Sequence, residues 1–425
     1  MTAVTSFDAA PADPPPLPPA NGVLFNGAED TFWRLLTRGA MLLFATLGIY
    51  RFWLQTDVRR FLWNNTEIAG EHLEYIGTAR ELLLGFLIAI AFLVPLYAIF
   101  GLASLVAEWA GQLAGLLSLV TLAVLGQFAV YRARRYRLSR TVYRGIRFHQ
   151  TGSAWRYAIC AIFWWGMIGM TLGLAYPWAQ ASLERFKMRN TWYGDLRGEF
   201  TGSGTRLFFR GVLLWFVAVA PFVLGLIVAG AMFDGTLVGE AAKQGTRSGA
   251  NALDAAGTGP AAAAAILATL WLVIAIAVLY PAFQAMVLRW WISGLRFGEL
   301  TATSHLRTGT VYRLYWRFVW MSLVLALVVG AVGFLAVEVV FGANASRGRM
   351  PFEVVELSLA IGFYVITALA YSTIYQATVK LPFWRYGFES AELNGVAVLD
   401  RVRAAPATGS PVGEGFADAL NVGGI

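Results

Sequence analysis

The chain has 425 residues, of which 58% are hydrophobic and only 14% are charged, and its mean hydropathy is +0.59. About a quarter of the residues are charged in an ordinary soluble protein, so the composition excludes that class and indicates a membrane protein. The formal net charge is +8, and the basic residues stand beside apolar stretches. This arrangement favours contact with anionic phospholipid headgroups over nucleic acid, for which the sequence has no binding motif.

The two ends of the chain differ from the rest in composition. Residues 1–22 are rich in Pro and lack the apolar core of a signal peptide, so they predict a disordered arm. Residues 404–425 have a similar low-complexity character and predict a disordered tail. One transmembrane domain is therefore expected over residues 23–403.

Six apolar stretches are long enough to cross a bilayer, which takes about 20 helical residues. They form three pairs, and the connection within the second pair is a Gly/Ala-rich extramembrane loop over residues 234–260. Pro95 and Pro221 are expected to kink two of the spans, either at a binding site or as a packing feature. The predicted spans are residues 82–107, 112–131, 207–233, 261–288, 314–341 and 354–379.

Two further apolar segments, 31–56 and 157–183, are shorter and share the sequence T-L-G at Thr46 and Thr171. Each lies within 33 residues, counted from a repeated Gly to a repeated Arg, which is too few for two full spans. We therefore expect six full spans and two short re-entrant or interfacial elements. Eight full spans is the alternative.

The charges of the connecting segments predict the orientation. Residues 132–156 hold eight arginines and no acidic residue, and residues 184–210 and 289–317 are also net basic. Basic loops face the cytoplasm under the positive-inside rule. We expect these connectors and the N-terminus on the cytoplasmic side of a bacterial inner membrane.

The most informative feature is a repeated sequence motif, called the phrase below. An Arg and an aromatic residue are followed by a Thr six residues after the Arg and by a Gly eleven residues after the Thr. Such internal repetition predicts repeated structural units. The three copies are Arg60-Phe61…Thr66…Gly77, Arg135-Tyr136…Thr141…Gly152 and Arg185-Phe186…Thr191…Gly202. A degraded copy begins at Arg289, and a last one places Lys380 in the Arg region.

The connectors after each Thr alternate short apolar and polar runs around a central Gly, which predicts small cytoplasmic β-hairpins. Asn394-Gly395 is a further hairpin signal in the last copy. An isolated hairpin is marginally stable, so the hairpins are expected to pair into a small sheet. Their predicted positions are residues 59–80, 134–152, 184–205, 289–309 and 380–400.

The polar residues of the phrase, together with a Gln five residues before three of the arginines, are the candidate site residues. In one interpretation they form a ring of donors for a headgroup or an anionic solute, because guanidinium binds phosphate in a bidentate manner. In the other, they anchor helix ends at the membrane interface and satisfy backbone groups there. They are Gln55, Arg60, Thr66, Arg135, Thr141, Gln180, Arg185, Thr191, Gln284 and Arg289.

No catalytic, cofactor-binding or metal-binding residue is predicted. Cys160 is the single cysteine, and His72, His149 and His305 do not have the spacing of a metal site. The sequence lacks the motifs of a phosphate-binding loop and of a serine hydrolase. We expect a protein that is not an enzyme.

The T-L-G segments, their aromatic clusters and the Arg–aromatic–Thr phrase resemble the YjgN family of uncharacterised bacterial inner-membrane proteins over residues 23–400. The resemblance implies an integral membrane protein and supplies no activity or site residue. The predicted fold class is all-α polytopic, with internal repeats.

Two functions are compatible with these features. The first is a transporter- or channel-like protein that handles a small solute or a lipid. The alternative is a non-transporting membrane scaffold whose cytoplasmic hairpins bind a partner. No sequence feature specifies an oligomeric state.

Overall fold

The computed structural model describes residues 22–103, 108–232, 258–345 and 354–404. The predicted arm over residues 1–22, the loop over 234–260 and the tail over 404–425 lie outside the described residues, except at their edges. The described chain is mostly helical, and it also contains a ten-stranded antiparallel sheet.

The chain repeats one order of elements: strand, helix, helix, strand. This order defines five units, which begin at strands β1, β3, β5, β7 and β9. Their strands are β1 Val23–Phe25, β2 Thr66–Ile68, β3 Glu71–Tyr75, β4 Thr141–Tyr143, β5 Ile146–Gln150, β6 Thr191–Tyr193, β7 Leu196–Phe200, β8 Leu295–Phe297, β9 Leu300–Ser304 and β10 Ala391–Asn394.

Each unit carries a helical hairpin, and in unit 5 the returning arm has three consecutive pieces. The described helices are α1 Glu29–Ala45, α2 Arg51–Asn64, α3 Ala79–Ala103, α4 Glu108–Ser139, α5 Ala154–Met170, α6 Tyr176–Arg189, α7 Gly204–Ala231, α10 Thr258–Gly294, α11 Thr308–Ala345, α12 Val354–Tyr375, the π-helix η1 Gln376–Lys380, α13 Leu381–Glu389 and the 3₁₀-helix η2 Val396–Arg401.

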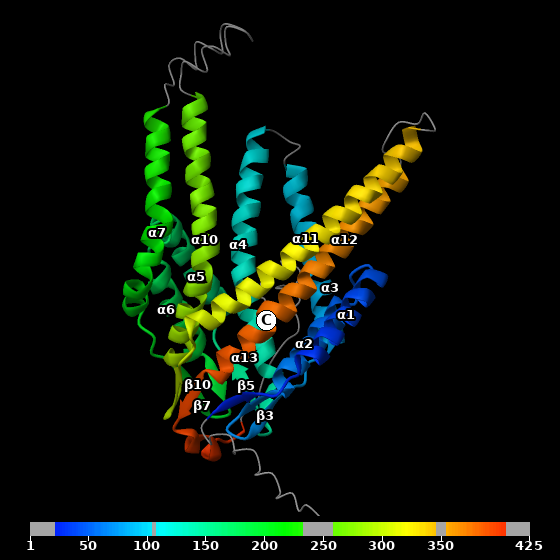
Figure 1. Ribbon diagram of the computed structural model, residues 1–425. Helices are drawn as coiled ribbons and strands as arrows, with labels where there is room; N and C mark the ends of the chain where they lie inside the picture. The colour runs from blue at the N-terminus through cyan, green and yellow to red at the C-terminus, as the bar shows by residue number, and fades with distance from the viewer. Residues whose placement is uncertain (1–21, 104–107, 233–257, 346–353, 405–425) are drawn as a thin grey trace, which may run out of the picture.

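Every strand of the sheet pairs with its neighbour in chain order, from β1 to β10. The first and last strands also meet, through an antiparallel bridge between Gly22 and Glu392. The sheet therefore closes into a ring, and the helices rise from one side of it (Figure 1). Closure leaves no long unpaired edge, which is how barrels avoid edge-to-edge association.

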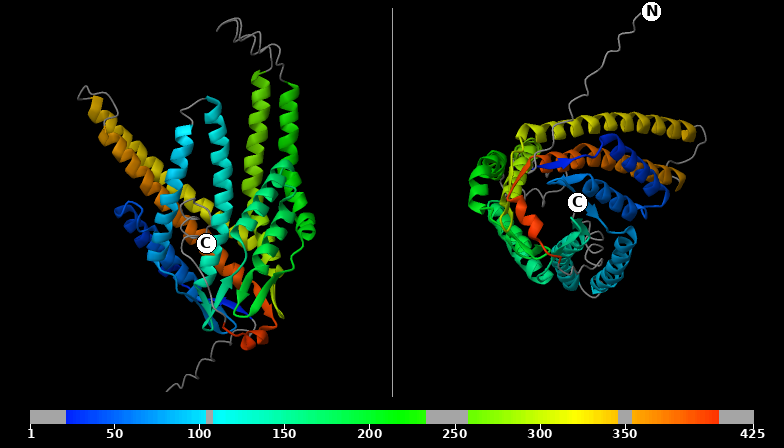
Figure 2. Two further views of the ribbon diagram at one scale, coloured as in Figure 1. Left: turned by 180° about the vertical axis from the view of Figure 1, so that it is seen from behind. Right: turned by 90° about the horizontal axis from the view of Figure 1, so that it is seen from below.

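The helices follow the same circular order as the strands. Each helical hairpin contacts the next one along the chain, and α12 contacts α1 to complete the circle. Seen from below, the helices are arranged around the ring, and the α11–α12 hairpin leans away from the α7–α10 hairpin (Figure 2).

Six of the described helices are long and apolar enough to cross a membrane. They belong to units 2, 4 and 5 and correspond to the six spans predicted from hydropathy. Their bounds are Ala79–Ala103, Gly111–Ser139, Gly204–Ala231, Gly259–Gly294, Thr308–Ala336 and Leu357–Glu389.

Units 1 and 3 contain the two short apolar segments. Helices α1 and α5 have 17 residues each, and α2 and α6 have 14. Each pair turns around and returns to the ring, so neither segment is the single crossing helix that the eight-span alternative requires. At 1.5 Å per residue the short helices are at most about 26 Å long.

The same turn joins the two helices in both short units. Leu172 and Gly173 have φ values of +49° and +94°, and Leu47 and Gly48 have almost the same values. The Thr171 hydroxyl donates to the Met167 carbonyl and accepts from the Ala175 amide, at 2.7 and 3.0 Å. Thr46 makes the equivalent pair of bonds in unit 1. The T-L-G sequence thus satisfies its own backbone groups, while Leu47 is 95% exposed.

The expected fold class is confirmed in part: the described chain is mostly helical with six candidate spans, but its strands form a ten-stranded sheet, so it is not all-α. Four of the predicted hairpin regions hold strand pairs, from β2–β3 to β8–β9. The fifth, residues 380–400, is not a hairpin. Its strand β10 pairs with β9, and after Asn394 the chain enters η2 through Gly395, whose φ is +82°.

The interior of the ring is apolar. Leu73, Tyr143 and Tyr193 form a buried cluster with Leu399 of η2. The hydroxyl of Tyr193 donates to the Tyr143 carbonyl, and that of Tyr143 donates to the Ile68 carbonyl, at 3.0 and 2.8 Å. η2 covers the end of the ring away from the helices (Figure 1), so the ring is filled with side chains and closed at that end.

Candidate functional site

Three of the four candidate arginines bind the backbone at the point where the next unit's helix begins. Each donates to the carbonyl 17 residues later in the chain. Arg60 reaches its acceptor at 3.0 Å, and Arg289 also contacts the Thr308 hydroxyl at 3.1 Å. In chain order, the donors are Arg60, Arg135 and Arg289, and the acceptors are Gly77, Gly152 and Leu306.

Arg185 differs from the other three. Its Nε donates to the carbonyl of Ala181 in its own helix, at 3.0 Å. The fifth unit has Arg385-Tyr386 at the same distance before its strand β10 as the other Arg–aromatic pairs. The sequence interpretation that placed Lys380 in the Arg position is therefore five residues too early.

The threonines of the phrase connect one unit to the next. Each hydroxyl donates to the carbonyl four residues earlier, at the end of its own helix. Each also accepts a hydrogen bond of 3.0 Å from the preceding unit around the ring. The donor–acceptor pairs are Trp384–Thr66, Trp63–Thr141 and Arg134–Thr191.

The repeated glycines are required by close packing. A Cβ built on Gly77 would lie 2.5 Å from the Tyr75 side chain, and one on Gly202 would lie 2.5 Å from Phe200. In both cases the aromatic ring two residues earlier folds back over the glycine. The strand-to-helix turn can take this shape only without a side chain at that position.

The candidate glutamines are half-buried and belong to different units. Gln284 donates to the Tyr280 hydroxyl at 2.5 Å, while Gln55 and Gln180 lie in α2 and α6. Thr66, Thr141 and Thr191 likewise belong to three different strands. The structure therefore distributes the candidate residues around the ring and does not bring them together at one point.

A buried polar cluster that sequence reasoning missed joins units 2, 3 and 4. Arg134 donates to the Gln150 Oε1 at 3.5 Å as well as to Thr191. Glu184 accepts from Lys187 and, at 3.1 Å, from Trp291. Burial lowers the pKa of Lys187, and the neighbouring Glu184 opposes that shift. The signal was available, because Arg134 and Glu184 each stand immediately before a phrase arginine.

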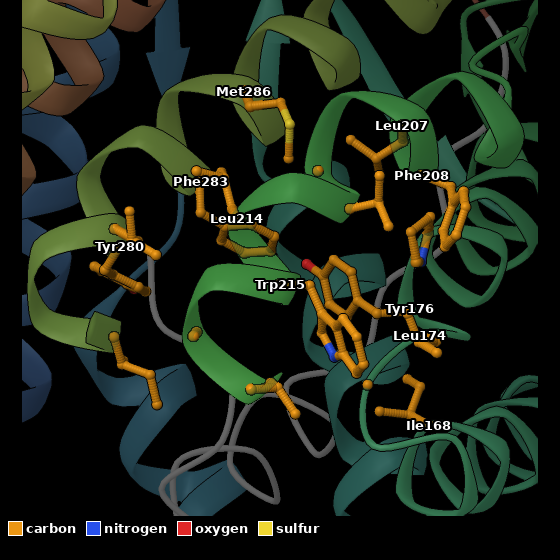
Figure 3. A pocket seen from close by; sticks show the side chains of 18 of the residues that line it. Ile168, Leu174, Tyr176, Leu207, Phe208, Leu214, Trp215, Tyr280, Phe283 and Met286 are labelled. Atoms are coloured by element: carbon orange, nitrogen blue, oxygen red, sulfur yellow. The ribbon is translucent and has the colours of Figure 1, made fainter. Parts of the chain in front are cut away.

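An apolar pocket lies between the short unit 3 and the long helices of unit 4. Its volume is about 320 Å³. The walls come from the α5–α6 turn, the first half of α7 and the facing part of α10, and nearly all of the lining atoms are apolar. Aromatic and aliphatic side chains surround the space (Figure 3), including Phe208, Trp215, Phe283 and Met286.

Two indole nitrogens, one in the pocket wall and one beside it, donate to backbone carbonyls. The Trp215 Nε1 donates to the Leu172 carbonyl in the turn at 2.7 Å. The Trp271 Nε1 donates at 3.2 Å to the Val217 carbonyl, which lacks its usual helical partner because Pro221 has no N–H.

These contacts bear on the two interpretations of the prolines. Pro221 lies inside α7, two residues after Val219, the last residue of this helix that lines the pocket. Pro95 lies inside α3, at a nearly matching place in unit 2.

Among the described residues, no group of three or more His, Cys, Asp or Glu side chains could hold a metal ion. Cys160 is half-buried beside the cluster of Tyr131 and Tyr157. The ring of His149 stacks on Trp192 with centroids 6.1 Å apart.

Comparison with known families identifies the family to which the chain belongs. Residues 21–258 match the model of a family described as bacterial protein of unknown function, DUF898. The match covers more than half of the sequence. The chain belongs to the DUF898 family. Membership agrees with the resemblance to YjgN-like proteins, and the matched region contains units 1 to 3 and helix α7. No curated protein and no solved structure matches the chain.

Proposed function

We propose that the protein handles a membrane lipid, which it takes up by an acyl chain into the pocket beside α5 and α6 and then moves or shelters. The observation that carries this proposal is the composition and place of the pocket. It is apolar on nearly all sides and lies among helices that are suited to a bilayer. An aqueous solute would find few hydrogen-bonding partners there, whereas a hydrocarbon chain needs none.

The short units support a lateral route of entry. In unit 3 the wall of long helices is interrupted, because α5 and α6 turn back at Gly173 while α7 and α10 continue. The turn itself is suited to hydrocarbon, since Met170 and Leu172 are exposed and its backbone groups are satisfied internally. A lipid in the surrounding leaflet can therefore reach the pocket above this turn.

The filled ring favours a lipid over a channel substrate. Leu73, Tyr143 and Tyr193 occupy its interior, and η2 covers its free end. An ion or solute that followed the axis of the protein would have to pass this apolar layer. The connectors at the ring are basic. This favours a ring on the cytoplasmic side of a bacterial inner membrane, with the N-terminus on the same side.

Two measurements on the purified protein test the proposal. In liposomes, fluorescent phospholipids with several headgroups are followed from one leaflet to the other, and mass spectrometry identifies lipids that stay bound after purification. We expect either faster movement or a retained lipid. Ala218→Trp, which fills the pocket, should reduce the effect, and Leu224→Trp on the exposed face of the same helix should not. The absence of both movement and retention across the panel would contradict the proposal.

The membrane-scaffold alternative has one observation in its favour. The hairpin turns at Gly70 and Gly145 are exposed on the side of the ring away from the helices, so a partner could bind there. Photo-crosslinking from these two positions in cells would give a defined protein adduct if the ring recruits a partner. Labelling of cysteines at the same positions would also report which side of the membrane the ring faces.

A further inference from the structure

The two short units provide an internal comparison for the pocket. Unit 1 and unit 3 have the same T-L-G turn, and each is followed by a long helix that begins with the same spacing from the repeated Gly. Leu82 of α3 and Leu207 of α7 occupy matching positions and are both 1% exposed. Differences between the two places can therefore be assigned to individual residues.

In unit 1 the corresponding space is filled. Phe86 of α3 packs on Phe52 of α2, with ring centroids 5.2 Å apart. The guanidinium of Arg51 lies over both rings, 5.8 Å from the centroid of Phe52 and 5.9 Å from that of Phe86. These three side chains close the junction between α2 and α3.

At the junction of unit 3 with unit 4 each of these three residues is replaced. Gly211 of unit 4 stands where unit 2 has Phe86, and in unit 3 Pro177 and Tyr176 stand where unit 1 has Phe52 and Arg51. All three replacements line the pocket. The loss of one aromatic side chain at Gly211, together with the loss of a charge at Tyr176, therefore turns a packed junction into an apolar cavity.

Gly211 is not required by the backbone or by tight packing. A Cβ built there would meet only the flexible end of Met286, at 3.0 Å from its terminal methyl carbon. The repeated glycines 77 and 202, by contrast, are each covered by an aromatic ring. The walls are apolar on nearly all sides, so an apolar occupant would gain dispersion contacts with them.

We infer that Gly211 opens a binding site for a single aliphatic chain of a phospholipid in the ring-side leaflet, and that Phe86 keeps the equivalent place between units 1 and 2 closed. The chain would lie against α7 and α10, among the rings seen in Figure 3. Arg206 and Arg210 are exposed on α7, within one turn of Leu207 and Gly211 and toward the ring. They suit an anionic headgroup at that end of the chain. This inference rests on the proposed function and adds the ligand and the residue that admits it.

The site can be tested by direct labelling, whether or not lipid is moved. The full-length protein in vesicles of phosphatidylglycerol and phosphatidylethanolamine is irradiated with a phosphatidylglycerol that carries a diazirine on one acyl chain. Peptide mapping then locates the adducts. We expect labelling of pocket residues on α7 and α10, and a decrease of about tenfold in Gly211→Phe, equivalent to a loss of about one order of magnitude in affinity.

Three variants make the result specific. Gly230→Phe introduces the same side chain on the same helix into open space and should label like the unmodified protein. Phe86→Gly should create a new labelled site on α3. Ala218→Phe fills the pocket from another position and replaces Gly211→Phe if that variant does not fold.

The outcomes separate this inference from the proposed function. Pocket labelling that Gly211→Phe abolishes, without lipid movement or retention, supports the site and contradicts the function. Lipid movement with adducts spread evenly over the exposed helices, unchanged in Gly211→Phe, supports the handling of lipid but overturns the site and uptake through the pocket. Equal labelling of Gly211→Phe and Gly230→Phe also overturns it.

Discussion

Three of the four candidate arginines make their contacts at a junction between units, whereas Arg185 bonds within its own helix. Arg60, Arg135 and Arg289 donate to backbone carbonyls at the start of the following unit. A charged donor that satisfies a helix-start carbonyl fixes the angle between the strand and the next helix. Headgroup binding by these residues stays a prediction, and the structure offers a way to separate the two roles.

The first prediction concerns the difference between Arg289 and Arg185. Arg289→Gln removes two hydrogen bonds to the next unit, whereas Arg185→Gln removes one within its own helix. We expect Arg289→Gln to lower the free energy of unfolding by about 1–3 kcal/mol, and Arg185→Gln to lower it by less. Thermal unfolding in detergent measures both.

A headgroup site would give a different pattern. If the arginines act together on a lipid, the two substitutions should reduce binding of anionic lipid to the same extent and leave stability alike. Equal stability of the two variants would therefore contradict the junction role.

At the scale of elements, the T-L-G turn reverses a short helical hairpin while pairing its own backbone groups. Its threonine replaces the backbone bonds that the turn interrupts, and the Leu172 carbonyl receives a bond from Trp215. In hydrocarbon, water is absent and an unsatisfied backbone group costs several kcal/mol. A turn with these bonds therefore suits both a re-entrant and an interfacial element.

The second prediction follows from that turn. Thr171→Val keeps the shape of the side chain and removes both hydrogen bonds, so we expect a loss of about 1–3 kcal/mol in the free energy of unfolding. Thr171→Ser should retain most of it. Thr269→Val is the matched control, because the Thr269 hydroxyl only adds a bond to the Ala265 carbonyl on an exposed helix face. A Thr171→Val variant as stable as Thr269→Val would show that the turn does not depend on the hydroxyl.

The sequence predicted the long helices better than the sheet for a physical reason. A span is encoded by some twenty consecutive apolar residues, and each of the six is visible in hydropathy. The strands have three to five residues, and their partners are chosen by which helical hairpins stand side by side. The hairpin predicted over residues 380–400 was also wrong. In this last unit Ala391 replaces the Thr that marks the start of the strand in the first three units.

The pocket was harder to predict than the phrase. The pocket depends on the absence of a side chain at Gly211, and a single glycine produces no signal in hydropathy or in residue spacing. An alignment of units 1 and 2 with units 3 and 4 places Gly211 opposite Phe86 and would have indicated the difference, but only the fold shows that Phe86 fills a space between helices. The candidate arginines stood out because they repeat, and repetition in this chain accompanies shared architecture.

At the scale of the whole molecule, the ring unites units that differ in length. Its apolar interior is shared by side chains from several strands and by η2, so the loss of one part exposes the rest. The long hairpins, by contrast, have largely exposed apolar surfaces that a bilayer would cover. The two regions should therefore respond differently to truncation.

The third prediction tests this division. Deletion of residues 396–425 removes η2 and uncovers Tyr143 and Tyr193, so we expect a lower unfolding temperature and faster proteolysis within the hairpin turns. Insertion of the six spans should be unaffected. Deletion of residues 405–425 leaves η2 and its contacts with the ring in place and serves as the control. A variant without η2 that resists protease like this control would show that the ring is stable without its cover.

The bridge between Gly22 and Glu392 has a consequence for synthesis of the protein. Strand β1 leaves the ribosome long before β10, so the sheet stays open until β10 has been made. By then all six membrane helices have been made. During that interval β1 and the newest strand present unpaired edges, which are open to wrong pairing with another chain. Assembly of the ring is thus a late step, and a nascent chain that stalls before Asn394 has no means of completing it.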